Sequence, residues 1–443
     1  MWNRKGVAAA VLSIIGVAGA GLAQATDGYF SHGYGMKAKG RGGASTAMTT
    51  DTFGGANNPA SMVWVGDRLD IGMDWFRPDR EASRSGSAAG VNGSASGNDT
   101  KDFLIPEFGY NKLIRPDLSL GVSVYGNGGM NTDYRAGAIS CAGIGGLASA
   151  NLLCGPGSLG VDLSQLIIAP TAAMKINERH SFGVSPLIAY QRFKADGLGG
   201  FAQISSDPGN LTGRGYDNAW GWGVRVGWLG KLSETVSLGA AYSSKVRMGE
   251  FDKYRGLFAE QGGFDIPENY NLGVAWKASG AVTLAMDYQR INYSGVKAVG
   301  NASNIPGCTA APPNGPGTGL ACLGASAGSI GFGWQDINIV KIGVEYAYSK
   351  NMTLRAGYNH SDNPIQARDV TFNILAPGVV RDHVTLGFTY GLDGGSEITM
   401  AYMHAFKKSV SGRANNPYFN VGGTETISLS ENSLGIAWGK TFR

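Results

Sequence analysis

A strict two-residue alternation of side-chain type constrains this 443-residue chain more than any other feature. In the stretch WGWGVRVGWLG, residues 220–230, one parity is apolar and aromatic as far as Trp228, and the other is glycine with one arginine as far as Gly227. Because successive side chains of a β-strand point to opposite faces, this stretch predicts a strand with one apolar face. Residues 69–75 and 340–348 repeat the pattern. The sequence therefore predicts an all-β fold.

About fourteen such segments follow one another along the chain. Most are long enough for the roughly 9 to 11 residues of a tilted transmembrane strand, and Trp and Tyr fall near their ends. Short connections follow the even-numbered segments and long connections follow the odd-numbered ones. This sorting is typical of an antiparallel transmembrane β-barrel of about 14 strands with apolar side chains facing lipid, whereas a soluble sandwich has no reason for it. The segments are 68–77, 103–114, 118–126, 164–176, 180–193, 218–230, 235–249, 268–277, 281–296, 334–349, 352–361, 382–391, 396–407 and 430–442.

Residues 1–25 have the pattern of a signal peptide, with a basic start, an apolar run and the small-residue site Ala23-Gln24-Ala25. The alternative is an N-terminal membrane anchor, but the run is barely long enough to span and is rich in Gly and Ala. Beyond Leu22 no run of about 18 apolar residues occurs. An exported chain with barrel-type strands is expected to cross the bacterial outer membrane many times.

Composition and motifs exclude several functions. The net charge of +4 is too small to indicate a nucleic-acid partner. The sequence contains no HExxH or GxxxxGK motif, and we expect no enzyme activity, no cofactor and no metal. His383 and nearby hydroxyl residues leave a barrel hydrolase as an alternative, but nothing in the sequence singles out His383.

The four cysteines form two local pairs, Cys141 with Cys154 and Cys308 with Cys322, each within one long connection. Long connections of a barrel lie on the oxidising outer face, where disulfides persist. Three connectivities are possible, and the local pairing would close each connection on itself.

Cations occupy the parity that would face the lumen in several segments. They could form ion pairs with acidic neighbours such as Glu345, or one or two of them could bind an anionic head group, and parity does not choose. These residues are Arg225, Lys245, Arg247, Lys341, Arg355 and Arg381.

Two motifs precede the first predicted strand, GRGGA at 40–44 and Asn58-Pro59-Ala60 within GGANNPASMV. Together with the stretches 118–134, 221–246, 266–277 and 352–365, they resemble the FadL/TodX family of outer-membrane transporters for long-chain fatty acids and other hydrophobic molecules. The resemblance implies that residues 26–67 fold as a hatch inside a barrel formed by residues 68–443. A disordered periplasmic linker is the alternative. The hatch residues would be Gly40, Gly42, Gly43, Asn58, Pro59 and Ala60.

The resemblance also implies passive uptake by a monomeric channel, with capture at outer loops, hatch rearrangement and lateral exit into the outer-membrane lipid at a kinked third strand. Gly126, Gly128 and Gly129 are the kink candidates, and a plain strand end is the alternative. The substrate would be a hydrophobic small molecule, a fatty acid or a hydrocarbon. A porin for polar solutes and a surface adhesion barrel are other possible functions. Apolar residues after the fifth and seventh strands could bind the substrate or simply pack the loops together: Leu198, Phe201, Ile204, Tyr254, Leu257, Phe258 and Phe264.

Overall fold

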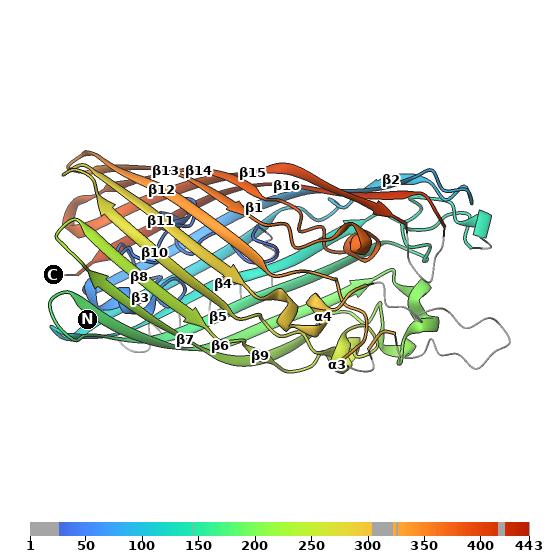
Figure 1. The fold of residues 1–443 in the computed structure, drawn as a ribbon, viewed down its shortest axis with the longest axis horizontal. Coiled ribbons are helices and arrows are strands. Elements are labelled where there is room, and N and C mark those ends of the chain that lie inside the picture. Colours follow the sequence, from blue (N-terminus) through green and yellow to red (C-terminus); the bar gives the residue numbers. More distant parts are fainter. Residues whose placement is uncertain (1–25, 145, 304–321, 325–326, 415–420, 443) are drawn as a thin grey trace.

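The computed structural model describes residues 26–144, 146–303, 322–324, 327–414 and 421–442, so the predicted signal peptide lies outside the described residues. Over these ranges the chain forms one barrel of fourteen antiparallel strands, closed by pairing of the first strand with the last (Figure 1). The predicted fold class and strand number are confirmed. The barrel strands are β1 (Arg68–Ser85), β3 (Phe103–Arg115), β4 (Leu118–Tyr134), β5 (Leu159–Lys175), β6 (His180–Asp196), β7 (Asp217–Lys231), β8 (Val236–Ser243), β10 (Asn269–Lys277), β11 (Val282–Ile291), β12 (Ile337–Ser349), β13 (Met352–Ser361), β14 (Asp382–Gly391), β15 (Ser396–Arg413) and β16 (Thr424–Thr441).

Short elements complete the fold. Strand β2 (Gly93–Ser96) pairs with β1, and β9 (Arg247–Met248) pairs with β7. None of the described helices has the length and apolar character needed to cross a membrane. The α-helices and the 3₁₀ helices, marked η, are α2 (Met36–Lys39), η1 (Pro59–Trp64), η2 (Ala142–Ile144), η3 (Gly199–Ile204), η4 (Pro208–Asn210), η5 (Asp252–Tyr254), α3 (Ala259–Gly262), η6 (Tyr293–Gly295), α4 (Lys297–Gly300), η8 (Ala367–Asp369), α5 (Val370–Asn373) and η9 (Asp393–Gly395).

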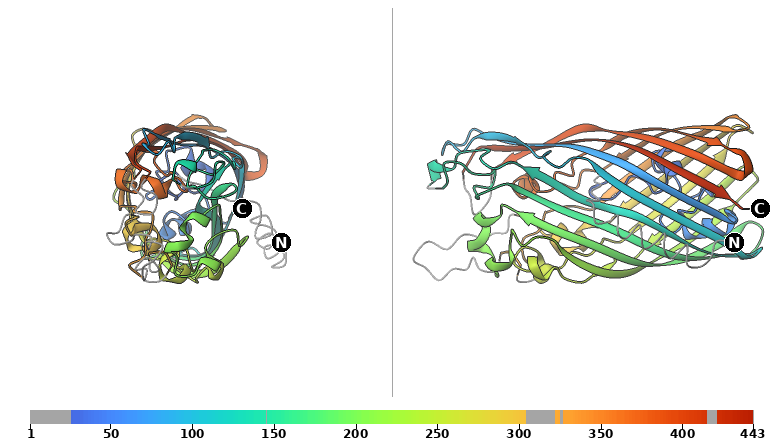
Figure 2. Two further views of the ribbon diagram at one scale, coloured as in Figure 1. Left: turned by 90° about the vertical axis from the view of Figure 1, so that its right-hand side faces the viewer. Right: turned by 180° about the vertical axis from the view of Figure 1, so that it is seen from behind.

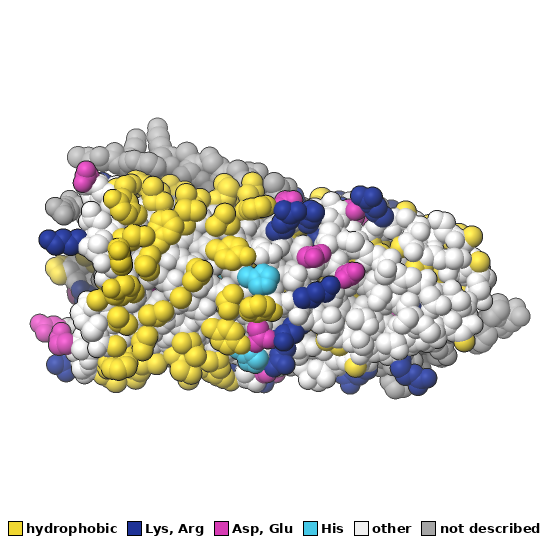
Figure 3. All heavy atoms as spheres, turned by 90° about the horizontal axis from the view of Figure 1, so that it is seen from above, with side chains coloured by type: hydrophobic (Ala, Val, Ile, Leu, Met, Phe, Trp, Pro, Cys, Tyr) yellow, Lys and Arg dark blue, Asp and Glu magenta, His cyan; other side chains and the backbone are white. Residues whose placement is uncertain are grey.

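The two faces of the wall are arranged as in a membrane barrel. Trp222 of β7 points outward and is 70% exposed, while its strand neighbour Arg225 points inward and is 5% exposed. On the face seen in Figure 3, apolar side chains form a band over one half of the length of the cylinder, and the other half is mostly polar. An apolar outer surface and a polar inner surface suit a wall that contacts lipid outside and protein inside.

The connections are sorted by length. At one end of the barrel the strands join through short turns such as 116–117 and 350–351, and at the other through long segments such as 135–158 and 292–336. In outer-membrane barrels the short turns are periplasmic and the long connections are extracellular. The helices η3, α3, α4 and α5 all lie in long connections, at or near the extracellular end (Figure 1).

Several predicted bounds differ from the structure: β1, β4, β15 and β16 extend further toward the extracellular end than predicted, and two predicted strands are cut short or interrupted. The predicted strand 281–296 ends at Ile291, because the turn-forming Asn292 follows it and leads into η6, which contains Ser294 and Gly295. The predicted strand 235–249 breaks after Ser243 into β8 and β9. Ser243 pairs with Arg225 and Arg247 pairs with Trp222, so β8–β9 advances four residues while β7 advances three.

The extra residue reverses the parity of the chain, since a one-residue shift moves every side chain to the other face. Val246 therefore points inward and is buried, while Arg247 lies exposed beside the lipid-facing Trp222. The prediction that Arg247 faces the lumen is wrong for this reason.

Residues 26–67, here called the hatch segment, lie inside the barrel, nearer the periplasmic end (Figures 1 and 2). None of these residues is exposed. The segment contains little regular structure, with only α2 and η1 as helices, so its backbone polar groups need partners on the wall. Because the hatch segment fills the lumen, any molecule that crosses the barrel must pass it, and the candidate site begins with this segment.

Candidate functional site

Glycines allow the hatch segment to lie against the wall. A Cβ on Gly42 would lie 2.8 Å from the backbone nitrogen of Tyr358, and a Cβ on Gly357 would lie 2.1 Å from the nitrogen of Gly42. Gly42 and Gly43 also have positive φ, +65° and +87°, which other residues rarely adopt. Gly40 lies against β14 near Gly387. The GRGGA run thus meets β13 and β14 at backbone contact distance.

The Asn-Pro-Ala motif fastens the other end of the hatch segment. Asn58 caps η1 by accepting a hydrogen bond from the Ala60 nitrogen at 3.1 Å, and Pro59 occupies the first helical position. The Asn58 side-chain nitrogen donates to the carbonyls of Thr46, at 2.8 Å, and Trp228, at 2.9 Å. The Ala60 carbonyl accepts from Ser181 Oγ at 2.8 Å. This motif therefore joins the segment to β6 and β7.

Buried charges connect the hatch segment to the wall. Glu345 of β12 bridges Arg41 of the segment, at 2.6 Å, and Arg355 of β13, at 2.5 Å. Lys39 pairs with Asp74 of β1, and Asp287 of β11 accepts from the backbone nitrogens of residues 45 and 46 at 2.7 and 2.8 Å. We call these contacts the polar clasp. Its bonds are directional and shielded from water, so they fix the segment in one place.

The β3–β4 ladder is interrupted on its extracellular side. Its last pair is Phe108 with Val124, although β3 stays paired with β1 as far as Phe103. Beyond this point β4 carries a one-residue bulge at Asn127, between Gly126 and Gly128. The predicted glycine positions thus lie at a bulge in the third barrel strand, and their role in lateral exit stays a prediction.

The start of the hatch segment fills this interruption. Ser31 donates from its backbone nitrogen to the Asn127 carbonyl at 3.1 Å, and Gly129 donates to the Tyr29 carbonyl at 3.0 Å. Phe30 forms an isolated antiparallel bridge with Gly128. A Cβ on Gly128 would lie 1.7 Å from the Tyr29 oxygen, so only glycine permits this approach. Residues 29–31 act as a strand-like patch over the open edge of β4.

An aromatic cluster lies behind the patch. Tyr29 lies 5.2 Å from Tyr293 and 5.8 Å from Trp334, measured between ring centroids, and Tyr293 lies 5.2 Å from Trp334. Trp334 Nε1 donates to the side chain of Asn373 at 2.6 Å, and Tyr293 accepts from the Tyr29 nitrogen at 3.1 Å. Sequence reasoning missed this cluster, whose only signal was aromatic residues in the hatch segment and in one long connection.

The cluster opens into a cavity of about 20 Å³ beside the interruption, lined by Phe76, Met130, Trp334, Ala376 and Leu429 among others. A volume of this size holds about one water molecule. A larger ligand would therefore have to displace the patch or the aromatic cluster.

The predicted loop residues are all buried in this structure, with exposures from 0 to 3%. Three aromatic rings of the connections pack against Phe193 of β6. The centroid of the Phe193 ring lies 4.9 Å from that of Tyr254, 4.8 Å from that of Phe258 and 5.5 Å from that of Phe251. In the observed conformation these residues pack the connections together and form no exposed groove. Their role in substrate capture stays a prediction. They are Leu198, Phe201, Ile204, Tyr254, Leu257, Phe258 and Phe264.

Two polar groups of these loops have shifted pKa values. Burial raises the pKa of the Tyr254 phenol, whose hydroxyl donates to the Gly215 carbonyl at 2.6 Å. Hydrogen bonds from Asn210 and Arg255 lower the pKa of the exposed Asp207 carboxyl. The pair Asp207–Arg255 joins the connections after β6 and β8 at 2.5 Å.

The predicted lumen cations are mostly engaged by protein groups. Arg225 donates to the carbonyls of Ala56 and Asn57, Lys341 donates to the His32 carbonyl at 2.8 Å, and Arg355 belongs to the polar clasp. Lys245 donates to the Gly295 carbonyl at 2.6 Å. Arg381 donates to the Ser361 carbonyl at 3.1 Å, but its guanidinium reaches His360 at 3.2 Å on the outer wall, so the prediction that it faces the lumen is wrong. These contacts favour the ion-pair and hydrogen-bond interpretation over a free head-group site.

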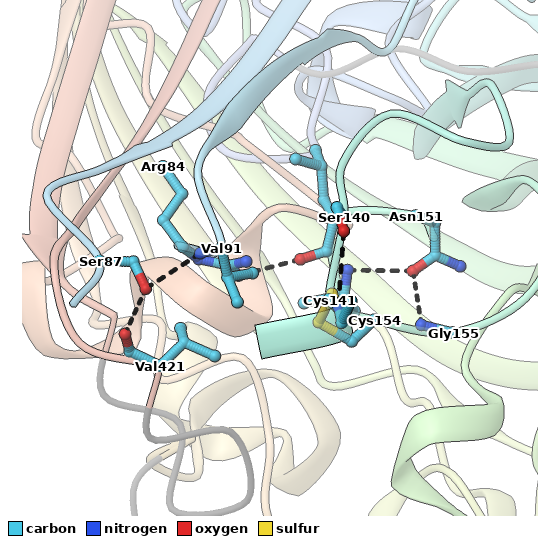
Figure 4. The surroundings of a disulfide bond; sticks show 12 residues. Arg84, Ser87, Val91, Ser140, Cys141, Asn151, Cys154, Gly155 and Val421 are labelled. Carbon is cyan, nitrogen blue, oxygen red and sulfur yellow. Dashed lines mark hydrogen bonds between the residues drawn. A yellow bond between two sulfur atoms is a disulfide. The ribbon is translucent and has the colours of Figure 1, made fainter. Parts of the chain in front are cut away.

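The Cys141–Cys154 disulfide predicted from the local pairing is present and closes part of the connection between β4 and β5 (Figure 4). Near it, Arg84 of β1 donates to the Leu152 carbonyl at 2.9 Å and pairs with Glu425 of β16. The disulfide-closed connection is thereby held to both strands that close the barrel. Cys308 of the second predicted pair lies outside the described residues, and no described cysteine is free.

The comparison with protein families decides the class of this barrel. Residues 16–442 match the family model described as outer membrane protein transport protein (OMPP1/FadL/TodX). The chain belongs to this family. As a member of the FadL/TodX family it is an outer-membrane transport protein, which agrees with the barrel, the apolar band and the sorted connections. No curated protein matches the chain in sequence.

Solved structures with the same fold include two named transporters. The P. putida toluene transporter TodX is 19% identical, with a TM-score of 0.65, and the match covers 93% of this chain and 99% of TodX. The Ralstonia pickettii toluene transporter TbuX is 17% identical, with a TM-score of 0.61, over 93% of this chain and 99% of TbuX. A Pseudomonas aeruginosa FadL homologue is 16% identical, with a TM-score of 0.68, over 94% of this chain and 100% of the homologue. At these identities the likeness establishes the fold.

Proposed function

We propose that this FadL/TodX family protein takes up uncharged hydrophobic molecules, such as monoaromatic hydrocarbons, and releases them sideways between β3 and β4. The observation that carries the proposal is the interrupted β3–β4 ladder, filled by residues 29–31 and backed by an aromatic cluster. A route through the wall lets an apolar molecule enter lipid directly, so that it avoids a cost of about 0.8 kcal/mol for each CH₂ exposed to water.

The patch suits a movable closure. Its bonds to β4 are a few backbone hydrogen bonds, and the Tyr29, Tyr293 and Trp334 rings can repack without losing apolar contact. Residues 26–67 would act as the hatch, with the polar clasp as its fixed part and residues 29–31 as its moving part.

The saturated lumen cations favour an uncharged cargo over a carboxylate. Arg225, Lys341 and Arg355 already donate to the hatch segment or to Glu345, so a fatty-acid head group would have to replace those bonds. The names of TodX and TbuX, both toluene transporters, point the same way. A long-chain fatty acid is the competing cargo within the family.

Uptake in cells lacking their own transporter would test the cargo. Cells expressing the chain should accumulate labelled toluene, and labelled long-chain fatty acid should enter more slowly. Faster entry of the fatty acid would replace the hydrocarbon assignment. If neither compound enters although the protein is inserted in the outer membrane, the proposed function is wrong.

A reversible staple would test the route. A Cβ on Gly126 would lie 2.8 Å from Cγ2 of Ile105, so the double variant Ile105→Cys/Gly126→Cys places two thiols across the interruption at disulfide reach. Oxidation should abolish uptake, and a reductant should restore it.

The matched control staples the same two strands where they are already paired. Tyr110 and Val122 lie directly opposite each other in the β3–β4 ladder. The variant Tyr110→Cys/Val122→Cys should transport equally well oxidised and reduced. Equal transport by both oxidised variants would exclude exit between β3 and β4.

A further inference from the structure

The outer wall changes from apolar to charged over three rows of side chains on β13, β14 and β15. In the first row Leu386 faces Tyr402, and in the second row Val384 lies between Tyr358 and His404. In the third row Asp382 lies opposite His360. The rows rise toward the extracellular end, and acidic, basic and histidine side chains gather along that edge of the apolar band (Figure 3).

A bulge in β15 adds two lysines to the third row. Ala405 pairs with Glu431 and Lys408 pairs with Leu429, so β15 contains one extra residue there. Regular alternation would turn every second side chain inward. With the bulge, Phe406 and Lys407 are both exposed, and the Lys408 side chain is 42% exposed. Bulges commonly re-aim side chains in this way.

Asp382 organises the cations around it. Its Oδ1 accepts from Tyr358 at 2.6 Å and contacts His360 Nδ1 at 2.7 Å, and its Oδ2 pairs with Lys408 at 3.0 Å. Arg381 approaches the other nitrogen of His360 at 3.2 Å. Arg381 and Lys408 thus flank the His360–Asp382 pair, and Lys407 precedes Lys408 in β15; we call these three cations the cationic ledge.

The cations of the ledge are paired unequally. Asp382 offsets Lys408, while Lys407 is close to two acids of β1: Asp79, and Glu81, which pairs with it at 2.8 Å with both side chains 56% exposed. An exposed pair of this kind opens readily for a better anion. Arg381 forms no ion pair with a described carboxylate, so Arg381 and Lys407 are the cations that can turn to a new anion.

We propose that the cationic ledge binds the phosphate of an outer-leaflet glycolipid whose acyl chains lie on the apolar rows below it. Leu386 and Asp382 are four positions apart, about 13 Å along the strand, which at a tilt of about 35–45° raises the ledge by roughly 10 Å along the membrane normal. That height leads from the outer part of the hydrocarbon core into the head-group region of a leaflet. Phosphate accepts charge-assisted hydrogen bonds from Arg and Lys, and the apolar rows supply a surface for the chains.

Titration of the detergent-solubilised, delipidated full chain with lipid A, followed by native mass spectrometry, would test the site. Diphosphoryl lipid A should bind about tenfold or more tightly than dephosphorylated lipid A with the same acyl chains. The variant Arg381→Ala/Lys407→Ala/Lys408→Ala should lose that preference. Equal binding of the two lipids by the unaltered protein would overturn the proposal, because the acyl chains alone would then hold the lipid.

A control variant removes three exposed cations from the periplasmic turns, Arg115→Ala/Arg179→Ala/Lys350→Ala, and should keep the preference. If both triple variants lose it equally, general charge attraction explains binding and the ledge has no special role. Inorganic phosphate should not compete at concentrations at which lipid A saturates the site. Competition at those concentrations would identify a free-phosphate site instead. Should the triple variant fail to fold, Lys408→Gln alone should weaken binding of diphosphoryl lipid A, and unchanged binding would likewise overturn the proposal.

Discussion

The two halves of the lumen are filled in opposite ways. Nearer the periplasmic end, the polar clasp joins the hatch segment to the wall through buried charges such as Arg41, Glu345 and Arg355. Nearer the extracellular end, apolar rings such as Tyr29, Tyr293 and Trp334 fill the space. Charged hydrogen bonds demand one geometry, whereas apolar contacts tolerate several. The comparison indicates that the periplasmic half of the lumen seals the barrel, and that the extracellular half can rearrange to admit a cargo.

Removing the central acid of the clasp should give the largest effect. Glu345→Ala leaves Arg41 and Arg355 buried without their shared carboxylate, and breaking a buried pair costs about 3 to 5 kcal/mol. The hatch segment should loosen, and ionic conductance in planar bilayers should rise. Glu178→Ala, in an exposed periplasmic turn, is the control and should leave the conductance unchanged. An unchanged conductance in Glu345→Ala would show that the clasp does not seal the lumen.

Truncating the aromatic cluster should reduce transport without opening a leak. Trp334→Ala removes a ring that is 1% exposed, and we expect a loss of about 3 kcal/mol in folding stability, at the lower end for such changes because neighbouring rings can collapse. Hydrocarbon uptake should fall while ionic conductance stays low. The lipid-facing Trp222→Ala should change neither. A rise in conductance in Trp334→Ala equal to that of Glu345→Ala would erase the distinction between the two halves.

The barrel was predictable because its signals are local. Alternation with a period of two, as in residues 220–230, marks a strand regardless of its partners, and sorted connection lengths give the topology. The bulge that turns Arg247 outward carries no such mark, because a single extra residue between 244 and 246 resembles a regular strand. Whether a loop side chain is buried is also not local, so the sequence could not show that Phe258 packs against Phe193.

The aromatic cluster was harder to predict because its parts are far apart in the chain. Tyr29 and Tyr293 are separated by 264 positions and meet only when the barrel has closed around the hatch segment. The polar clasp has the same property, since Arg41 and Glu345 lie 304 positions apart. The sequence offered the glycines and the Asn-Pro-Ala motif, but it did not give the wall residues that they meet.

The disulfide should matter less than either half of the lumen. Cys141→Ala/Cys154→Ala removes a closure of 13 residues, which constrains the unfolded chain by at most about 3 kcal/mol and acts on one connection. Hydrogen exchange should accelerate in residues 135–158, and uptake should fall less than in Trp334→Ala. Reduction of the unaltered protein also breaks the disulfide of Cys322, and it should accelerate exchange in residues 135–158 as much as the double variant does. If uptake by the Cys141→Ala/Cys154→Ala variant is as low as in Trp334→Ala, the connection 135–158 also takes part in transport.

Removing the charge of Asp207 in the exposed pair Asp207–Arg255 should give the smallest effect. Comparing this exposed pair with the buried polar clasp shows whether the clasp is strong because of its charges or because it is buried. Hydrogen bonds from Asn210 and Arg255 lower the pKa of Asp207, so its contribution to stability is present at neutral pH and is lost as the pH falls through that lowered value. At neutral pH, Asp207→Asn should slightly accelerate hydrogen exchange at the Asn210 amide, and the difference should disappear in strong acid. Asp252→Asn in the neighbouring connection should have no effect. Glu345→Ala should accelerate hydrogen exchange in the hatch segment. If Asp207→Asn accelerates exchange at Asn210 by as much, burial does not set the strength of these contacts. A small acceleration would confirm that the clasp owes its hold to exclusion of water.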